Sequence, residues 1–307
     1  MKKGMLFLFL GLLLTSCGTS SRLGKDVKTE HLPAPPGTIE LAENAFFDMT
    51  EVTNFHWLEY LFWIGRTYGK NSTEYQSMLP DTTVWIKLDS SYRGHEAFYL
   101  RHRAYFDYPV VGISYEQAVQ YCNWRSDRVM EYMLIKRKVI PWRVDAPADS
   151  AFTIEKYFRG AYYGVQPDPH LMVYPHYSLP DSLTYRKAIV FADSLNAKNI
   201  RSCRKKHCIM DQYLGRLCPE NRPDRSQYPY SPDPTMGVDC DYCRKDLIFH
   251  LKGNVREWTD LPGVVFGASF LDSCTLVPDY LFRKNAHSVN SYTGFRAHCV
   301  PVLLSPL

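Results

Sequence analysis

The stretch "KGNVREWTD", Lys252 to Asp260, constrains the fold of this 307-residue chain more than any other. Gly253 and Asn254 supply the backbone freedom that a tight turn requires. Glu257 and Trp258 follow, as a charged residue and a large apolar one often do where a half-buried strand begins. Taken alone, the stretch predicts a turn that leads directly into such a strand.

The N-terminus has the pattern of an export signal. Lys2 and Lys3 precede an apolar run from Met5 to Leu14, and "LTSC" ends at Cys17. The run is too short to span a bilayer as a mature helix, so residues 1–16 are predicted to be a signal peptide. "LTSC" resembles the lipobox of bacterial lipoproteins, in which the peptide is cut before the cysteine and the thiol is lipidated. An ordinary signal peptide with a chance cysteine is the alternative.

Lipidation of Cys17 predicts a membrane-anchored protein, because two acyl chains suffice for stable attachment. Gly, Thr, Ser and Ser follow Cys17, and no Asp indicates retention at the inner membrane. We therefore expect an outer-membrane lipoprotein that faces the periplasm, with the cell surface as the alternative. The polar, proline-ended segment 17–36 is predicted to be a flexible tether, and 37–307 to be one domain.

Composition favours a globular protein without a nucleic-acid partner. Hydrophobic residues make up 45% of the chain, which is enough for a core. The formal net charge of +4 falls to about +2 when Lys2 and Lys3 leave with the signal peptide. No basic face, internal repeat, P-loop or dinucleotide fingerprint is evident in the sequence.

Local patterns predict several elements of secondary structure. Residues 37–53 alternate like a hairpin that turns at Glu43 and Asn44. A helix is expected to follow, with Asn54 as N-cap and Gly65 as its stop. Ser114 and Gln117 form the capping box of a second helix. A third helix is expected near Asp181, and short apolar pieces between 261 and 302 suit a small terminal sheet.

Four stretches, in this order, resemble the formylglycine-generating enzyme family, whose domain is also called the sulfatase-modifying factor domain. They are "MTEVTNFHWLEYLFW" (Met49 to Trp63), "YPVVGISYEQAVQYCNWRSDR" (Tyr108 to Arg128), "KGNVREWTD" and "GASF…YTGFRAHC" (Gly267 to Cys299). "YSLPDSLTYRKA" (Tyr177 to Ala188) is a weaker fifth match, with Tyr185 where the family usually has Trp. The spacing departs from the family by two insertions, at about 129–176 and 195–248. The chain is most similar to lipoproteins of Bacteroidetes-type bacteria, some of which serve gliding motility and secretion.

The resemblance implies an α+β formylglycine-generating-enzyme fold. This fold is a variant of the C-type lectin fold, with small twisted antiparallel sheets, few helices and much ordered loop. Within it, Gly253 and Asn254 would make the turn into the sheet and Trp258 would fill the core. Glu257 would either order a loop or a calcium ion or cap a backbone amide, since one carboxylate is a thin ligand set for calcium. The motif residues expected to be structural are Gly253, Asn254, Glu257, Trp258, Gly294, Phe295 and Arg296.

The copper chemistry of the family's active enzymes is not expected here. Those enzymes hold copper(I) between two cysteines that follow a Gly-Gly-Ser turn, because soft thiolates suit that ion. In "GASFLDSCTLVPD" the two positions carry Asp272 and Val277, and only Cys274 is near. A related branch uses iron in a histidine-rich bundle, and no His-x-x-x-His-x-Glu pattern occurs in this chain. The resemblance thus implies a non-catalytic member, and a divergent centre of Asp272, Cys274 and His287 is the catalytic alternative.

The family resemblance also implies a disulfide between Cys122 and Cys299. Both positions are bridged in some members, although Cys299 sits two residues later than usual. Export to an oxidising compartment favours such a bridge. By chain entropy it would contribute up to about 4 to 5 kcal/mol.

A second group of cysteines lies in the later insertion. Disulfides, a structural zinc site with His207 as a possible substitute ligand, and a redox-active Cys-x-x-Cys pair are all compatible with their spacing. The odd number leaves Cys274 as a further partner. The group consists of Cys203, Cys208, Cys218, Cys240 and Cys243.

The expected role is therefore binding or assembly. We expect a structural component of a secretion, gliding-motility or envelope complex, with envelope or outer-membrane proteins as partners. The segment from Tyr162 to Ser178 has the aromatic and proline content of an exposed binding loop, or else it is an ordinary packed loop. A metal- and oxygen-dependent oxidase and a carbohydrate-binding protein remain as alternatives. Calcium and structural zinc are the cofactors left open.

Overall fold

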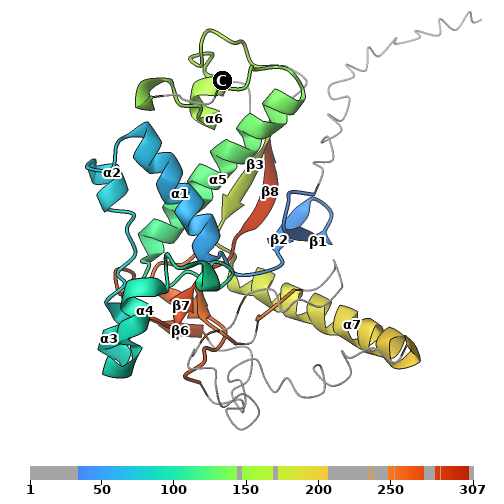
Figure 1. Ribbon diagram of the computed structural model, residues 1–307. Coiled ribbons are helices and arrows are strands. Elements are labelled where there is room, and N and C mark those ends of the chain that lie inside the picture. The colour runs from blue at the N-terminus through green and yellow to red at the C-terminus, as the bar shows by residue number, and fades with distance from the viewer. Residues whose placement is uncertain are drawn as a thin grey trace, which may run out of the picture. The chain divides into compact units, whose positions relative to one another are not determined.

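Helices and short strands form an α+β structure within the compact unit His31–Leu307 (Figure 1). The computed structural model describes residues 34–143, 147–168, 172–206, 235, 237, 248–251, 253–272, 281–283 and 285–303, with the backbone alone at 195–206 and 281–283. The predicted signal peptide and Cys17 lie outside the described residues, as does the predicted tether up to residue 33. The fold class implied by the family resemblance is confirmed.

The elements are, in chain order, β1 (Thr38–Ala42), β2 (Ala45–Asp48), α1 (Asn54–Thr67), α2 (Thr73–Gln76), α3 (Val84–Leu88), η1 (Ser90–Tyr92), α4 (Arg93–Phe98), η2 (Arg103–Tyr105), α5 (Tyr115–Lys136), η3 (Ala148–Ser150), α6 (Ile154–Phe158), β3 (Val173–Ser178), α7 (Ser182–Lys206), β4 (Arg256–Trp258), β5 (Val264–Phe266), β6 (Leu281–Arg283), β7 (Thr293–Gly294) and β8 (His298–Leu303).

The described strands form two sheets. The first has the order β1-β2-β8-β3 and is antiparallel throughout. The second has the order β6-β5-β4-β7, in which β4 and β7 run parallel. The predicted sheet between 261 and 302 exists only in part, because β8 leaves it and pairs with β2 and β3. Cys299 lies opposite both Phe46 and Tyr177, so the end of the domain completes the sheet that its beginning started.

The predicted hairpin is confirmed, with its turn at residues 43–44. Asn44 adopts a left-handed φ of 57°, which asparagine tolerates better than most residues. Its backbone N–H donates to the Glu40 carboxylate at 2.9 Å. Strand β2 then presents its successive residues Phe46 and Phe47 to opposite faces of the sheet.

The predicted N-cap and the predicted last residue of α1 are each wrong by one or two residues. Thr53 is the N-cap, and its hydroxyl accepts from the His56 N–H. Asn54 instead turns its side-chain amide to the carbonyls of Tyr99 and Tyr105, at 3.0 and 2.9 Å. Gly65 lies inside the helix, which ends at Thr67. The Asn54 amide is thus engaged in tertiary contacts with the segment after α4, and the cap falls on the preceding residue.

The second and third predicted helices are confirmed. Ser114 and Gln117 form the complete capping box of α5, with the Ser114 N–H donating to the Gln117 side chain at 2.8 Å. α7 begins directly after Asp181. It then continues to Lys206, so the segment expected to be an insertion from 195 starts as an uninterrupted extension of this helix.

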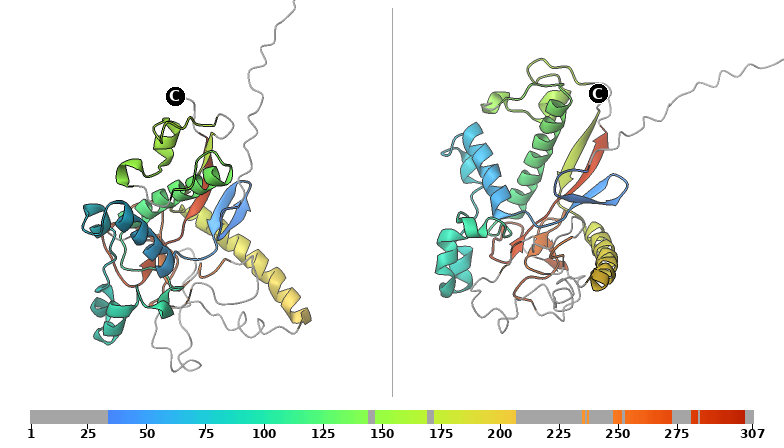
Figure 2. Two further views of the ribbon diagram at one scale, coloured as in Figure 1. Left: turned by 45° about the horizontal axis from the view of Figure 1, so that its top comes forward. Right: turned by 45° about the vertical axis from the view of Figure 1, so that its right-hand side comes forward.

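The first sheet lies between two apolar clusters. Phe46 belongs to the cluster formed with α1 and α5, where Trp57 stacks on Tyr121 with ring centroids 5.6 Å apart. Phe47 belongs to the cluster formed with α7, where its ring meets Tyr185 edge-on. The ribbon views show α1 and α5 side by side, and α7 beside the β1–β2 hairpin (Figure 2).

The segment expected as the first insertion folds around its own small core. It comprises the second half of α5, η3, α6 and most of β3. Met130, Leu134 and Phe152 are buried in a cluster with Tyr157 and Tyr162. Of the two interpretations of Tyr162 to Ser178, the exposed binding loop is wrong at Tyr162, which is buried, and neither loop interpretation holds for residues 173–178, which form β3.

We predict that Gly112→Ala lowers the free energy of unfolding by at least about 2 kcal/mol. Gly112 has a φ of +73°, and a Cβ there would lie 2.4 Å from the Asp81 carbonyl oxygen. Gly94→Ala is the matched control, since a Cβ at this helical position meets nothing within 4 Å. Alanine there should stabilise the protein slightly. Urea denaturation of both variants measures the difference, and equal stabilities would refute the steric account.

Candidate functional site

Several motif residues of the sequence meet at one arginine, Arg296, whose side chain is fully buried. Its Nε donates to both oxygens of Glu257, at 2.9 and 2.8 Å, and one terminal nitrogen donates to Glu257 at 2.6 Å. The guanidinium also donates to the carbonyls of Asp48 and Phe249, at 3.2 and 2.8 Å. A buried guanidinium needs such a counter-charge and such acceptors.

The structure therefore assigns Glu257 a role that neither sequence prediction proposed. Both of its oxygens bind Arg296, so it acts as the counter-ion of a buried cation. Trp258 is fully buried, as predicted, and its indole N–H donates to the Ile113 carbonyl. Asn254 has a left-handed φ of 64°, which confirms the turn before β4.

A second acid, Glu51, lies in the same buried centre. One of its oxygens accepts from the Asn254 side-chain amide at 3.0 Å, and the other lies 3.8 Å from an Arg296 nitrogen. Burial raises the pKa of Glu51 to about 8, while the charge of Arg296 opposes the shift and that of Glu257 adds to it. One arginine thus faces two carboxyls, of which Glu257 takes the hydrogen bonds.

Another ion pair fixes α5 on the first sheet. Arg125 donates to both oxygens of Asp48, at 2.7 and 2.9 Å. The same carboxylate accepts from the backbone N–H of Ala297 at 2.9 Å. The Arg125 guanidinium also covers the Tyr177 ring, 4.3 Å from its centroid. The bidentate geometry orients α5 relative to β2 and β3.

Asp272, which the family resemblance places at the first copper position, has structural partners for its carboxylate. It binds the Arg256 guanidinium through both oxygens, one of them at 3.0 Å from Nε. It also accepts from the Ser269 N–H and hydroxyl at 2.7 and 2.8 Å. These hydrogen bonds and the Arg256 charge lower the pKa of Asp272 even though partial burial opposes them.

The alternative centre of Asp272, Cys274 and His287 is not assembled among the described residues. His287 is exposed and lies 3.0 Å from the Glu116 carboxylate, whereas Asp272 pairs with Arg256. Cys274 and Val277 lie outside the described residues. No group of three or more metal-ligating side chains occurs in the part of the chain that the structure describes.

Of the cysteines singled out in the sequence, the structure describes the side chains of Cys122 and Cys299. Cys122 and Cys299 are both buried in the main core cluster, and both are free thiols, so the predicted bridge between them is not formed. Burial raises the pKa of both thiols, that of Cys299 to about 12, which keeps them protonated inside the apolar core. Cys203 lies on α7, where only the backbone is described. The remaining cysteines of the predicted group, Cys208, Cys218, Cys240 and Cys243, lie outside the described residues, as does His207.

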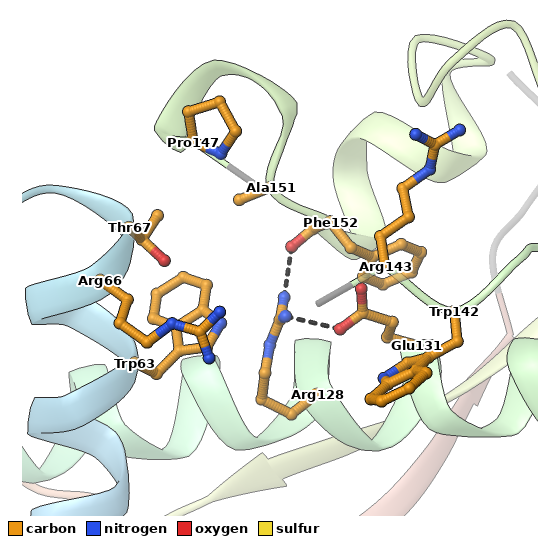
Figure 3. A pocket seen from close by; sticks show the side chains of 10 residues that line it. All are labelled: Trp63, Arg66, Thr67, Arg128, Glu131, Trp142, Arg143, Pro147, Ala151 and Phe152. Atoms are coloured by element: carbon orange, nitrogen blue, oxygen red, sulfur yellow. Dashed lines mark hydrogen bonds and ion pairs between the residues drawn. The ribbon is translucent and has the colours of Figure 1, made fainter. Parts of the chain in front are cut away.

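A cavity of about 440 Å³ opens between α1, α5 and the segment that follows α5 (Figure 3). Arg128 rises from α5 in its centre, donating to Glu131 at 2.6 Å and to the Phe152 carbonyl. Its guanidinium lies 4.6 Å from the centroid of the Trp63 ring. The remaining lining residues are Arg66, Thr67, Trp142, Arg143, Pro147 and Ala151.

The comparisons with known proteins define the family. The sulfatase-modifying factor enzyme 1-like domain, FGE-sulfatase, matches residues 10–190. Because this match covers more than half of the chain, the protein belongs to the formylglycine-generating enzyme, or sulfatase-modifying factor, family. The matched residues end before the "KGNVREWTD" and "GASF" stretches.

Solved structures similar to this chain include Treponema denticola variable protein 1, with a TM-score of 0.38 and 14% identity over 83% of this chain and 84% of that one. The crystal structure of CarF is similar at a TM-score of 0.38 and 14% identity, covering 84% of this chain and 86% of that one. No curated protein matches the chain significantly. Among the described helices, none has the length and apolar character needed to cross a bilayer.

Sequence reasoning missed Glu51, Asp48 and Arg125, although Glu51 and Arg125 lie in stretches that carry the family resemblance and Asp48 directly precedes the first of them. Their signal was charge placed among apolar residues, as in "MTEV" and "YCNWR". Such residues are rarely buried unless they are paired. The cavity was also missed, because Trp63, Arg128 and Trp142 become neighbours only through tertiary packing.

We predict that Glu51→Gln flattens the pH dependence of stability. A carboxyl whose pKa is raised in the folded state stabilises the fold fully below its unfolded pKa of 4.5, and this contribution is lost as the pH rises through about 8. Glutamine mimics the protonated carboxyl at every pH. Thermal unfolding from roughly pH 5 to 9 should therefore show the wild type losing stability relative to the variant.

The control for this experiment is Glu155→Gln, which removes an exposed carboxyl from α6. Its unfolding temperature should follow that of the wild type across the same range. If the unfolding temperature of Glu51→Gln also follows that of the wild type, the pKa of Glu51 is not raised in the folded protein. Arg296 then balances the negative charges of both Glu51 and Glu257.

Proposed function

We propose that this protein is a non-catalytic member of its family that acts as a binding or structural component of an outer-membrane-associated assembly. The assembly would serve secretion, gliding motility or the envelope. A lipid on Cys17 would hold the domain at the outer membrane, facing the periplasm. Envelope or outer-membrane proteins would be its partners.

One observation carries this proposal: the residue at the first copper position is an acid already bound within the fold. Asp272 is held by Arg256 and Ser269, so its oxygens serve a turn. A carboxylate is a hard ligand, whereas copper(I) prefers soft thiolates. The second copper position carries Val277, which offers no ligand atom at all.

We predict that Asp272→Ala lowers the free energy of unfolding by about 3 kcal/mol, because it leaves the Arg256 guanidinium without its counter-charge. Asp149→Ala, at an exposed position, is the matched control and should change stability by less than about 0.5 kcal/mol. Chemical denaturation measures both. A stable Asp272→Ala variant would contradict the structural role of this acid.

The wild-type protein should also bind no copper(I) tightly and convert no cysteine-containing peptide to an aldehyde. Mass spectrometry of the peptide after incubation with copper and oxygen provides the readout. Formation of an aldehyde that is lost in Cys274→Ala would overturn the non-catalytic proposal and establish the oxidase alternative.

Crosslinking in intact cells tests the assembly role. The native lipoprotein should bring down one envelope protein in near-equal amount when the crosslinked material is purified and analysed by mass spectrometry. Cys17→Ala should release the chain from the membrane fraction and reduce this recovery. Recovery of no specific protein from the wild type would refute the proposed role in an assembly.

A further inference from the structure

The cavity beside α1 and α5 has the size of a ligand site. Its volume of about 440 Å³ falls within the range of pockets that hold small ligands or side chains of a partner. A second hollow of about 370 Å³ adjoins it and shares Arg128, Glu131, Trp142 and Arg143. The two hollows therefore meet at Trp142 and Arg143, and together they can accept an extended ligand.

The charge of the first cavity favours an anion. Its lining carries three guanidinium groups and one carboxylate. Glu131 is already bound to Arg128, which also donates to the Phe152 carbonyl. Arg143 lies over the Tyr163 ring at 3.9 Å and forms no ion pair with the described residues. An aromatic face orients a guanidinium but leaves its hydrogen-bond donors available to a carboxylate.

The aromatic residues point to a partner that brings apolar side chains as well as charge. Trp142 is 73% exposed although it is the largest side chain of its segment, and Tyr132 in the second hollow is 56% exposed. Ile135 lines the same hollow. Exposed tryptophan, tyrosine and arginine residues in a concave site are the usual energetic centres of protein interfaces.

A peptide fits this lining better than a glycan or a free phosphate. The residues that line the two hollows include no Asn, Gln, Asp or His, which would pair with the many hydroxyls of a sugar. A small anion would leave the apolar surface around Trp142 and Ile135 uncovered. An extended chain with successive side chains about 3.3 Å apart along its axis would reach both hollows.

We propose that the two hollows bind an acidic peptide segment of a partner protein, with a carboxylate on Arg143 and an apolar or aromatic side chain against Trp142. This site deepens the proposed function and rests on it, since it names the surface through which the assembly partner is recognised. Trp142 and Arg143 belong to the segment 129–176, which was expected to be an insertion relative to the family, whereas Trp63, Arg66 and Arg128 lie outside it.

Fluorescence anisotropy of the full-length protein in detergent, with a fluorescein-labelled random copolymer of glutamate and tyrosine, tests the site. The copolymer should bind, and a lysine–tyrosine copolymer should not. Arg143→Glu and Trp142→Ala should each weaken binding at least tenfold, through a repelled carboxylate and a lost aromatic contact. Both positions are exposed, so the thermal unfolding of these variants should match the wild type. Arg143→Gln serves as a milder second variant if charge reversal disturbs the fold.

The control variants make a charge reversal and an aromatic-to-alanine change at exposed positions outside the two hollows. Arg93→Glu and Phe98→Ala alter exposed residues of α4, and both should bind like the wild type. Equal binding by all variants would overturn the site. Polygalacturonate or inorganic phosphate that displaces the copolymer at comparable concentration would also overturn it, in favour of a glycan or phosphate ligand.

Recovery of the crosslinked partner by the wild type and by Arg143→Glu distinguishes a failure of this site from a failure of the proposed function. If Arg143→Glu recovers the partner as efficiently as the wild type, the assembly role stands and this site fails. If the wild type recovers no partner, the assembly role fails whatever the copolymer does. A reduced recovery by Arg143→Glu, with the anchor intact, supports both.

Discussion

The buried pairing of Arg296 with Glu257 joins the parts of this fold. Arg296 lies in the chain between β7 and β8. Its guanidinium donates to the Glu257 carboxylate on β4 of the second sheet and to the Asp48 carbonyl at the end of β2 in the first. A charge in this position costs several kcal/mol of desolvation unless every donor finds a partner. The motif stretches "GNVREW" and "GFR" are therefore two halves of one interaction. Glu51 and Asn254 complete it, and the pKa of Glu51 rises because a second negative charge there would be poorly hydrated.

The same centre explains why the late motifs lie close to the early ones. β8 enters the first sheet between β2 and β3, so residues at the two ends of the domain become neighbours. Asp48 then serves two elements, binding Arg125 of α5 and the N–H of Ala297. Because the N-terminal hairpin, the long helix and the last strand share these contacts, none of them is expected to fold independently of the others.

The turn at Ser269 to Asp272, which the family resemblance aligns with the copper turn of active members, is closed by an ion pair. Asp272 accepts hydrogen bonds from Arg256 and Ser269, whereas the exposed His287 lies against Glu116. The rigid centre is thus used for structure, whereas the segment after α5 adds a cavity with exposed aromatic and cationic side chains. A stable scaffold with variable surface segments is well suited to binding, because the segments change without disturbing the core.

The sequence by itself determined the family, the fold class, the hairpin, the capping box of α5 and the start of α7. Each of these depends on residues close together in the chain or on motifs in a fixed order. Only the tertiary structure decided that Glu257 pairs with Arg296, that Thr53 rather than Asn54 caps α1, and that Cys122 and Cys299 stay unbridged. It also brought Trp63, Arg128 and Trp142 around one cavity. Such contacts join residues that are distant in sequence, and no local pattern encodes which buried donor will find which acceptor.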